Sequence, residues 1–186
     1  MRTVNFLLPL SALLATSALA APVTYAAQNG SATFEHKVGP VMVRGEIAGV
    51  SAQAKLDSAQ LTGTTGKVTV PLSDLKTGNG LRDSHAKSET ALATDKFPNA
   101  TFQLQNLSGG RLKEGQTVAT TAQGQLTVKG VTKTIVAPVK ATLRGDTVQV
   151  ATQFKFNPHD YGVNYRGTSS PSVTVNVSFD LKPTSR

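Results

Sequence analysis

The densest group of titratable side chains lies between residues 71 and 102, where Arg82, Asp83 and His85 follow one another closely. An arginine guanidinium presents a planar fork of donors that suits a phosphate or carbonyl oxygen, and a histidine beside it adds a further polar contact. Acid–base catalysis by Asp83 and His85 would need a third group that orients the base against a nucleophile, and the sequence offers none nearby. We therefore expect no catalytic residues, and we interpret Arg82 and His85 as candidate contacts for a polar head group.

Each of these side chains also has a structural interpretation. Asp83 would accept hydrogen bonds from backbone amides, Arg82 would pair with a carboxylate, and His85 would satisfy a buried carbonyl where a helix meets a sheet. The structural role is favoured for Asp83. Both roles stay open for Arg82 and His85.

Few other residues could take part in catalysis, metal binding or ligand binding. The sequence has no cysteine, which excludes a cysteine nucleophile, a thiolate metal site and a disulfide. Its three histidines, His36, His85 and His159, do not form the closely spaced pairs typical of metal sites, so we expect no metal and no other cofactor. A second irregular segment, residues 157–167, carries Tyr161, which we expect to line an entrance to the interior.

A helix is the element that must position the arginine and the histidine. Residues 81–92 are good helix formers on average, and Asn79 or Thr77 before them can cap free first-turn amides. Pro98 follows, and proline disfavours helix at the residue before it. The sequence therefore predicts one short helix over residues 81–92.

Most of the remaining sequence alternates apolar and polar residues with period two, which is typical of strands with one buried face. About eight such segments suit either a closed barrel or a two-layer sandwich. Long strands around a single helix favour an antiparallel eight-stranded β-barrel that the helix closes at one end. The segments are residues 31–38, 41–49 with 52–56, 66–72, 100–107, 117–128, 131–143, 147–156 and 173–181.

One face of these strands is aliphatic with a few phenylalanines, and we expect it to line the barrel. An eight-stranded barrel is just wide enough to be filled by side chains or to hold one slim ligand. Small residues on the strands either leave an internal slot or mark corners and bulges, and both interpretations stay open for Gly45, Gly49, Ala52, Ala54 and Gly124. The expected ligand contacts are Val43, Ile47, Phe102, Leu104, Leu126, Val128, Phe154, Phe156, Val175 and Phe179, with Val148, Val150, Val173 and Val177 on the same face.

Residues 1–20 have the features of a secretory signal peptide. Arg2 stands near the start, an apolar run covers residues 6–14, and small residues precede the expected cleavage after Ala20. We expect a mature chain of one domain over residues 21–186 and a periplasmic or secreted location. Without disulfides, such a domain must be held together by its core.

The sequence is basic, with a formal net charge of +8 and a pI of about 9.9. Its lysines and arginines are scattered singly and lack interleaved stacking aromatics, so we expect no nucleic-acid partner. A basic surface either approaches anionic membrane lipids or serves solubility alone, and both interpretations stay open. The sequence does not indicate an oligomeric state.

Four stretches carry a family resemblance. They are Leu75-x-Thr77-Gly78-Asn79-x-x-Arg82-Asp83-x-His85-x-Lys87, Lys96-Phe97-Pro98-x-Ala100-Thr101-Phe102, Gly124-x-Leu126-Thr127-Val128-x-Gly130-Val131-Thr132-Lys133 and, more weakly, Asp160-Tyr161-Gly162. In this order they resemble the YceI family of exported polyisoprenoid-binding proteins. The resemblance implies a lipocalin-like barrel whose lumen holds a long isoprenoid chain, such as that of a quinone or a prenyl phosphate, for storage, transport or protection in the cell envelope. Ala86 stands where that family usually has a leucine, which predicts a wider pocket mouth or a different ligand.

Two other functions remain as alternatives. The first is an envelope or stress-related barrel with a filled interior, which acts through its surface. The second, for which the sequence gives little support, is a lipid-modifying enzyme in which His85 and Asp83 act as acid and base.

Overall fold

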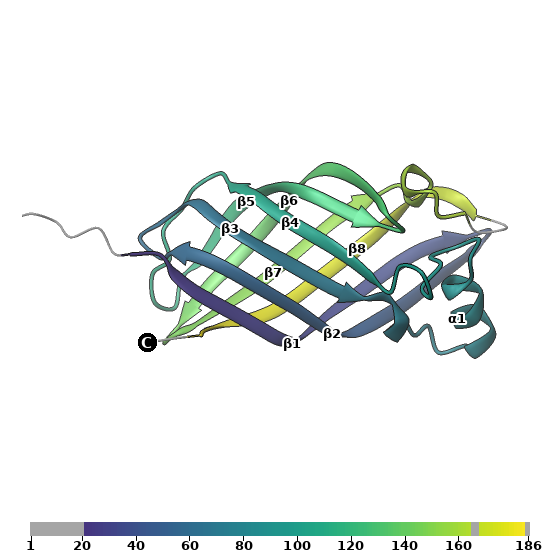
Figure 1. The fold of residues 1–186 in the computed structure, drawn as a ribbon, viewed down its shortest axis with the longest axis horizontal. Coiled ribbons are helices and arrows are strands. Elements are labelled where there is room, and N and C mark those ends of the chain that lie inside the picture. The colour runs from purple at the N-terminus through teal and green to yellow at the C-terminus, as the bar shows by residue number, and fades with distance from the viewer. Residues whose placement is uncertain (1–20, 165–167, 185–186) are drawn as a thin grey trace, which may run out of the picture.

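Eight strands follow one another around a closed barrel in the order of the sequence, and each neighbouring pair is antiparallel (Figure 1). The computed structural model describes residues 21–164 and 168–184. The strands are β1 (Val23–Val38), β2 (Val41–Asp57), β3 (Gln60–Pro71), β4 (Asn99–Leu107), β5 (Thr117–Val128), β6 (Val131–Arg144), β7 (Thr147–Phe156) and β8 (Thr168–Pro183). The predicted antiparallel eight-stranded barrel is therefore confirmed.

Strands β5 and β7 have the bounds that alternation predicts, whereas β1 and β8 are longer than expected. The extra residues of β1 pair with the far ends of both neighbours: Val23 lies opposite Leu56 of β2, and Tyr25 lies opposite Pro183 of β8. These contacts join segments far apart in the chain, so local alternation does not report them.

An irregularity near the middle of the β1–β2 ladder explains one of the small residues. Ala48 lies opposite Ser31 and Val50 opposite Gly30, which leaves Gly49 as an extra residue in β2. Its φ of +73° is a left-handed conformation that other residues rarely adopt. Gly49 thus marks a bulge, a feature that bends and twists the strand that carries it.

The helix α1 spans Gly80–Lys87, so it begins close to the predicted residue and ends earlier than residue 92. A short 3₁₀ turn, η1 (Leu72–Asp74), precedes it. Asn79 is the N-cap of α1, and its side-chain oxygen accepts a hydrogen bond from the amide of Arg82 at 3.0 Å. The predicted cap is thereby confirmed, because this contact satisfies a first-turn amide that lacks a helical partner.

The early end of α1 has a local and a tertiary cause. The hydroxyl of Ser88 donates to the carbonyl of His85 at 2.7 Å, and Ser88 leaves the helical conformation. Ala91 and Leu92 then turn into the barrel mouth, where they are only 1% and 8% exposed. Burial of these two side chains outweighs their helix propensity, so the prediction of helix through residue 92 was wrong.

The two ends of the barrel are covered differently. At the end opposite α1, the connection from β4 to β5 crosses the opening: the amide of Leu112 donates to Ser58 at 2.8 Å, and the amide of Leu61 donates to Gly110 at 3.0 Å. Leu112 is 5% exposed and packs into the cluster of buried side chains there. Helix α1 and a second 3₁₀ turn, η2 (Pro158–Tyr161), lie at the other end.

Candidate functional site

The barrel is hollow along part of its axis. A cavity of about 240 Å³, which we call the lumen, lies between the buried clusters at the two ends. Among the inward residues expected from alternation, its wall contains Ile47, Phe102, Leu104, Leu126, Val128, Val148, Val150, Phe154, Phe156, Val175, Val177 and Phe179. The small residues Ala52 and Ala54 also line it, so part of this set does leave internal space.

The deep end of the lumen offers a ligand hydrocarbon surface rather than hydrogen bonds. Two buried threonines border it, and both hydroxyls are engaged by the backbone. Thr64 donates to the carbonyl of Leu61 at 2.7 Å, and Thr120 donates to the carbonyl of Gly109 at 2.8 Å. An apolar group would enter this region without displacing either bond.

A second, larger cavity of about 1030 Å³ lies at the α1 end, and we call it the vestibule. Arg82, His85 and Val43, all expected as site residues, belong to its wall. Val41 and Leu81 also border it while remaining 56% and 69% exposed, so they form part of its rim. The vestibule therefore combines an apolar rim with polar groups from α1.

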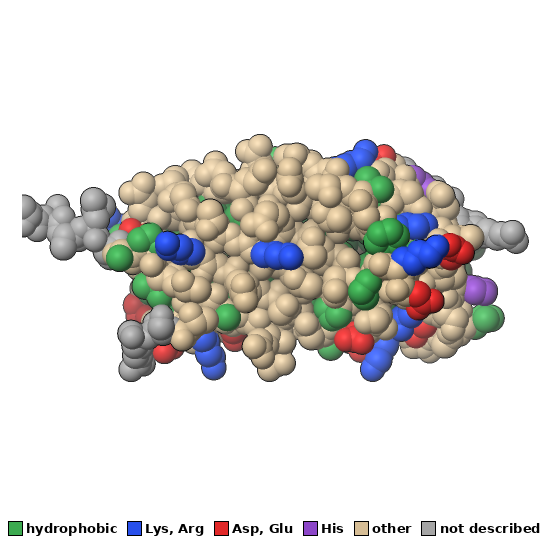
Figure 2. Space-filling model, viewed as in Figure 1, with side chains coloured by type: hydrophobic (Ala, Val, Ile, Leu, Met, Phe, Trp, Pro, Cys, Tyr) green, Lys and Arg blue, Asp and Glu red, His purple; other side chains and the backbone are tan. Residues whose placement is uncertain are grey.

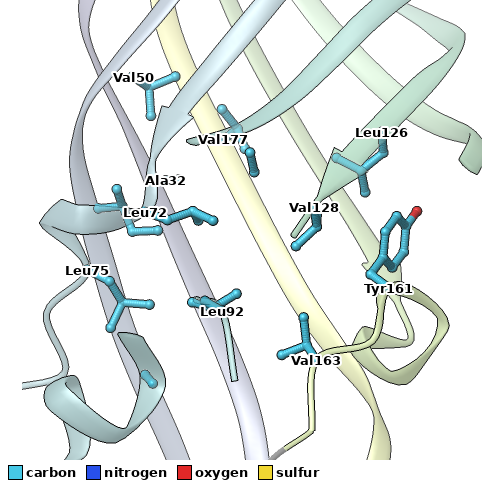
Figure 3. Close-up of a cluster of buried hydrophobic side chains, with 13 residues drawn as sticks. Ala32, Val50, Leu72, Leu75, Leu92, Leu126, Val128, Tyr161, Val163 and Val177 are labelled. Atoms are coloured by element: carbon cyan, nitrogen blue, oxygen red, sulfur yellow. The ribbon is translucent and has the colours of Figure 1, made fainter. Parts of the chain in front are cut away.

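Five apolar side chains border both cavities and define a throat between them: Phe34, Leu92, Val128, Phe156 and Val175. Figure 3 shows Leu92 and Val163, which project from loops at this end, together with Leu72 and Val128 in one buried cluster. The loop after α1 thus supplies part of the throat. Lumen and vestibule are therefore adjacent chambers with these five side chains between them.

Arg82 is held against the loop that precedes α1. Its Nε donates to the hydroxyl of Thr77 and its Nη2 donates to the carbonyl of Thr77, both at 2.8 Å. Asp83 accepts hydrogen bonds from the hydroxyl of Thr77 at 2.5 Å and from its amide at 2.8 Å. The hydroxyl bond is the main reason why the pKa of Asp83 is lowered, and nearby Lys87 and Arg82 add to the effect against partial desolvation. Asp83 has the structural role that was favoured for it, and Arg82 pairs with a threonine instead of the expected carboxylate.

The histidines at this end differ in burial. His85 is exposed on α1, so it does not have the buried position of its structural interpretation. His36 of β1, which was not expected in the site, is 6% exposed and borders the vestibule. Its Nδ1–H donates to the carbonyl of Ser172 at 3.4 Å. Burial lowers the pKa of His36 below 6.5, and His159 lowers it further against the opposing effect of the hydrogen bond.

Tyr161 packs against Phe156, one of the five throat residues. It is 2% exposed, and its ring meets Phe156 edge to face with 5.4 Å between centroids. The lumen and vestibule are lined by other residues, so Tyr161 does not have the entrance position expected for it. Burial raises the pKa of its hydroxyl, and the negative charge of Asp160 adds to this.

Charged side chains of both signs are mixed around the α1 end (Figure 2). Two ion pairs occur within the described ranges, Arg44 with Glu35 at 2.7 Å and Lys96 with Glu89 at 2.5 Å, and all four side chains are exposed. The same ranges contain no group of three or more histidine, aspartate or glutamate residues placed to hold a metal ion. None of the helices described here is long and apolar enough to cross a bilayer.

Sequence reasoning missed several lining residues, among them Phe34, His36 and Leu92. Phe34 and His36 stand in the alternating segment of residues 31–38, so the period-two signal for their inward direction was present. Leu92 had no such signal, because its position depends on how the loop after α1 packs onto the barrel.

Comparison with known proteins identifies relatives of this barrel. The sequence matches the YceI-like domain over residues 23–182. BcnA of Burkholderia cenocepacia has a TM-score of 0.68 at 20% identity, and the match covers 83% of this chain and 96% of that one. A polyisoprenoid binding domain from Saccharophagus degradans, implicated in plant cell wall breakdown, has a TM-score of 0.69 at 13% identity, with 87% and 99% covered. The YceI protein of Campylobacter jejuni has a TM-score of 0.65 at 19% identity, with 80% and 90% covered.

No curated protein matches the sequence significantly. At these identities the solved structures show a shared fold. The match to the family extends from the first residue of β1 almost to the end of β8. The chain therefore belongs to the YceI-like domain family.

Proposed function

We propose that this protein binds a polyisoprenoid lipid, with part of the hydrocarbon chain in the lumen and the polar head in the vestibule. The observation that carries the proposal is the throat, which joins a hydrocarbon-lined chamber to one whose wall holds Arg82 and His85. The description of the Saccharophagus degradans domain as polyisoprenoid binding supports this ligand class.

The sizes of the two chambers suggest how the ligand is divided. A cavity of roughly 150 Å³ holds one benzene molecule. The lumen, at about 240 Å³, then accepts a short apolar segment, on the order of one or two isoprene units. The vestibule, at about 1030 Å³, lies at the upper end of the size range of ligand pockets and has space for the head and the remaining units.

Affinity would come from the chain. Each buried methylene contributes about 0.8 kcal/mol to binding. Burial of a few isoprene units therefore offsets much of the free-energy cost of association. The end of the chain would be enclosed in the lumen, so lumen depth would contribute to the preference for chain length.

Head-group preference would come from α1. Arg82 is already fixed by Thr77, so its guanidinium loses little freedom when it meets an acceptor. A quinone carbonyl and a phosphate oxygen are both suitable acceptors for such a group. His85 adds a polar contact on the same side of the vestibule.

The contacts of Asp83 favour binding over catalysis. Its carboxylate is engaged by Thr77, so it does not orient His85 as a general base. We propose that the protein is exported by the signal peptide expected in residues 1–20 and that it stores, carries or protects its lipid in the cell envelope.

The direct test is native mass spectrometry of the protein purified from its own host, followed by organic extraction. A bound species from a series spaced by isoprene masses is expected. A clean apo mass, with no uptake of added quinone or prenyl phosphate, would contradict the proposal and favour a barrel that acts through its surface.

A matched pair of variants tests the lumen itself. Ala137 lines the lumen and is 5% exposed, so Ala137→Leu fills space that the chain would occupy. Ala48 is exposed on β2, so Ala48→Leu adds the same atoms outside. We expect the first variant alone to lose lipid or to retain shorter chains while both fold. Equal lipid content in the two variants would contradict a lumen site.

A further inference from the structure

Strands β6 and β7 pair with each other along only part of their length. Their ladder joins Val139–Arg144 to Thr147–Thr152 and stops there, whereas β5 pairs with β6 as far as Val131 and β8 pairs with β7 as far as Phe156. Pro138 stands where the ladder ends, and its carbonyl accepts a hydrogen bond from the hydroxyl of Thr152 at 2.7 Å. We call the separated parts, residues 131–138 of β6 and 153–156 of β7, the fork.

The tip of the β5–β6 hairpin is tied to loops rather than to β7. In the turn after β5, Lys129 donates through Nζ to the carbonyl of Gly162 at 3.0 Å and to that of Thr90 at 3.2 Å. These contacts hold β6 toward the vestibule loops. The fork is therefore a fixed feature of the fold rather than a frayed end.

The fork brings the apolar lumen close to the outer surface. Ile135 and Ala137 from β6 and Phe154 and Phe156 from β7 all line the lumen. Ile135 and both phenylalanines are only partly buried. Hydrocarbon inside the barrel would thus lie directly behind the separated strands.

The outer side of the fork combines an exposed apolar residue with positive charge. Val136 is 63% exposed. Lys140 of β6 and Lys155 of β7 are exposed on the same outer side, whereas Lys133 lies opposite Leu126 and so belongs to the other face of β6. Strands β4, β5, β6 and β7 contain no aspartate or glutamate, in contrast to the mixed charges around α1.

We propose that the face around the β6–β7 fork docks on an anionic lipid bilayer. Lys140 and Lys155 contact lipid phosphates, and Val136 enters the interface between the head groups and the acyl chains. The charge of this face favours an anionic bilayer as its partner, since exposed lysines accompany an exposed valine on strands without acidic residues. The docking proposal does not depend on the proposed function. The purpose of docking, which is lateral passage of an isoprenoid between bilayer and lumen, rests on that function.

The first test measures co-sedimentation of the purified protein with vesicles that contain no isoprenoid. We expect binding to vesicles of phosphatidylcholine with phosphatidylglycerol, weak binding to phosphatidylcholine alone, and loss of binding at high salt. Each lysine near an anionic surface is worth roughly fivefold in affinity, so the double variant Lys140→Gln, Lys155→Gln should bind about 25-fold more weakly.

The matched control removes the same charge elsewhere. Lys55 and Lys182 are exposed and lie outside β6 and β7. Their double change to glutamine should leave most of the binding intact. Equal loss of binding in both double variants would show that only net charge matters and would overturn the proposal, as would wild-type binding by the first variant.

A label reports which face meets the bilayer. Because the sequence has no cysteine, Val136→Cys provides a unique site for an environment-sensitive fluorophore. Its emission should shift to the blue with phosphatidylglycerol vesicles, whereas the same label at Ala48→Cys on β2 should not respond. A shift at both positions or at Ala48→Cys alone would overturn the proposal. A blue shift in protein that carries no lipid and takes up none would refute the proposed function while supporting docking.

Discussion

Phe34 of β1 lies over Gly45, its partner on β2, so closely that a Cβ at Gly45 would collide with Cζ and Cε1 of the ring. Because Gly45 has no side chain, the ring stays against the barrel wall at the throat rather than across it. Phe102 of β4 also lies over Gly124 of β5, where a Cβ would meet the carbonyl oxygen of Gln103 as well as the ring. The absence of a side chain at Gly45 leaves room for the ring of Phe34 at the throat.

Gly45→Ala should narrow the throat. The added methyl group pushes the ring of Phe34 into the throat, and such overpacking costs about 1–3 kcal/mol of stability. We expect lower lipid occupancy by native mass spectrometry and a lower midpoint in urea. The second change Phe34→Leu should restore part of the occupancy, because it removes the clash with the ring while the carbonyl oxygen of Lys76 still crowds the methyl group.

Gly80→Ala is the matched control for this substitution. No atom lies within 4 Å of a Cβ built at Gly80, and its φ is not positive. It should keep both occupancy and stability. Full occupancy in Gly45→Ala, with the same chain lengths as wild type, would show that the ligand does not pass Phe34.

The sequence predicts the barrel wall well because the wall obeys a local rule. Alternation with period two fixes which residues point inward once a strand exists, and turn residues such as Lys129 and Gly130 mark where it ends. This is why β5 and β7 have their predicted bounds and why the aliphatic face lines the cavities.

The loops and turns that cover the ends of the barrel do not follow such a local rule. Leu92 leaves the expected helix because the mouth of the barrel buries it, and Tyr161 packs behind Phe156 because η2 folds onto the outside of the throat. The fork between β6 and β7 has one sequence signal, Pro138, which cannot donate a backbone hydrogen bond to a neighbouring strand, but its extent is not evident from the sequence. Each of these features depends on contacts between distant segments.

Leu112→Ala should destabilise the protein by about 2–5 kcal/mol, the usual range for a buried leucine. Leu112 is 5% exposed and closes the end of the barrel opposite α1. The free energy of unfolding in urea gives this value. Lys113→Ala, next to it and exposed, should change stability by at most about 0.5 kcal/mol. A similar small effect at Leu112 would show that this connection does not seal the barrel.

Asp83→Asn should lower the melting temperature at pH 7. The carboxylate of Asp83 is stabilised in the folded state by Thr77, so its pKa lies below the ordinary 3.8. This contribution is present above pH 3.8 and is lost as the pH falls through the folded pKa. The melting curves of wild type and variant should therefore converge in acid. A difference that stays constant with pH would mean that the charge of Asp83 contributes nothing.

His36 should make stability depend on pH below neutrality. Its folded pKa lies below the ordinary 6.5, chiefly because burial disfavours the charged ring. Between these two values the unfolded chain binds more protons than the folded one, so stability falls as the pH drops through this window. His36→Gln should flatten this part of the curve, whatever its effect at pH 8. A titration of the His36 ring by NMR gives the folded pKa directly.

His159→Gln separates the two causes of the lowered His36 pKa. Removal of the positive neighbour should raise the pKa of His36 only in part, because burial is the larger cause. Since His36 borders the vestibule, a bound quinone head, which is neutral and excludes more water, should lower this pKa further, whereas the negative charge of a phosphate head should raise it. Quinone binding would then weaken as the medium becomes acidic. A His36 pKa at or above 6.5 in the lipid-free protein would contradict this coupling, because the buried ring would then accept a proton at no cost.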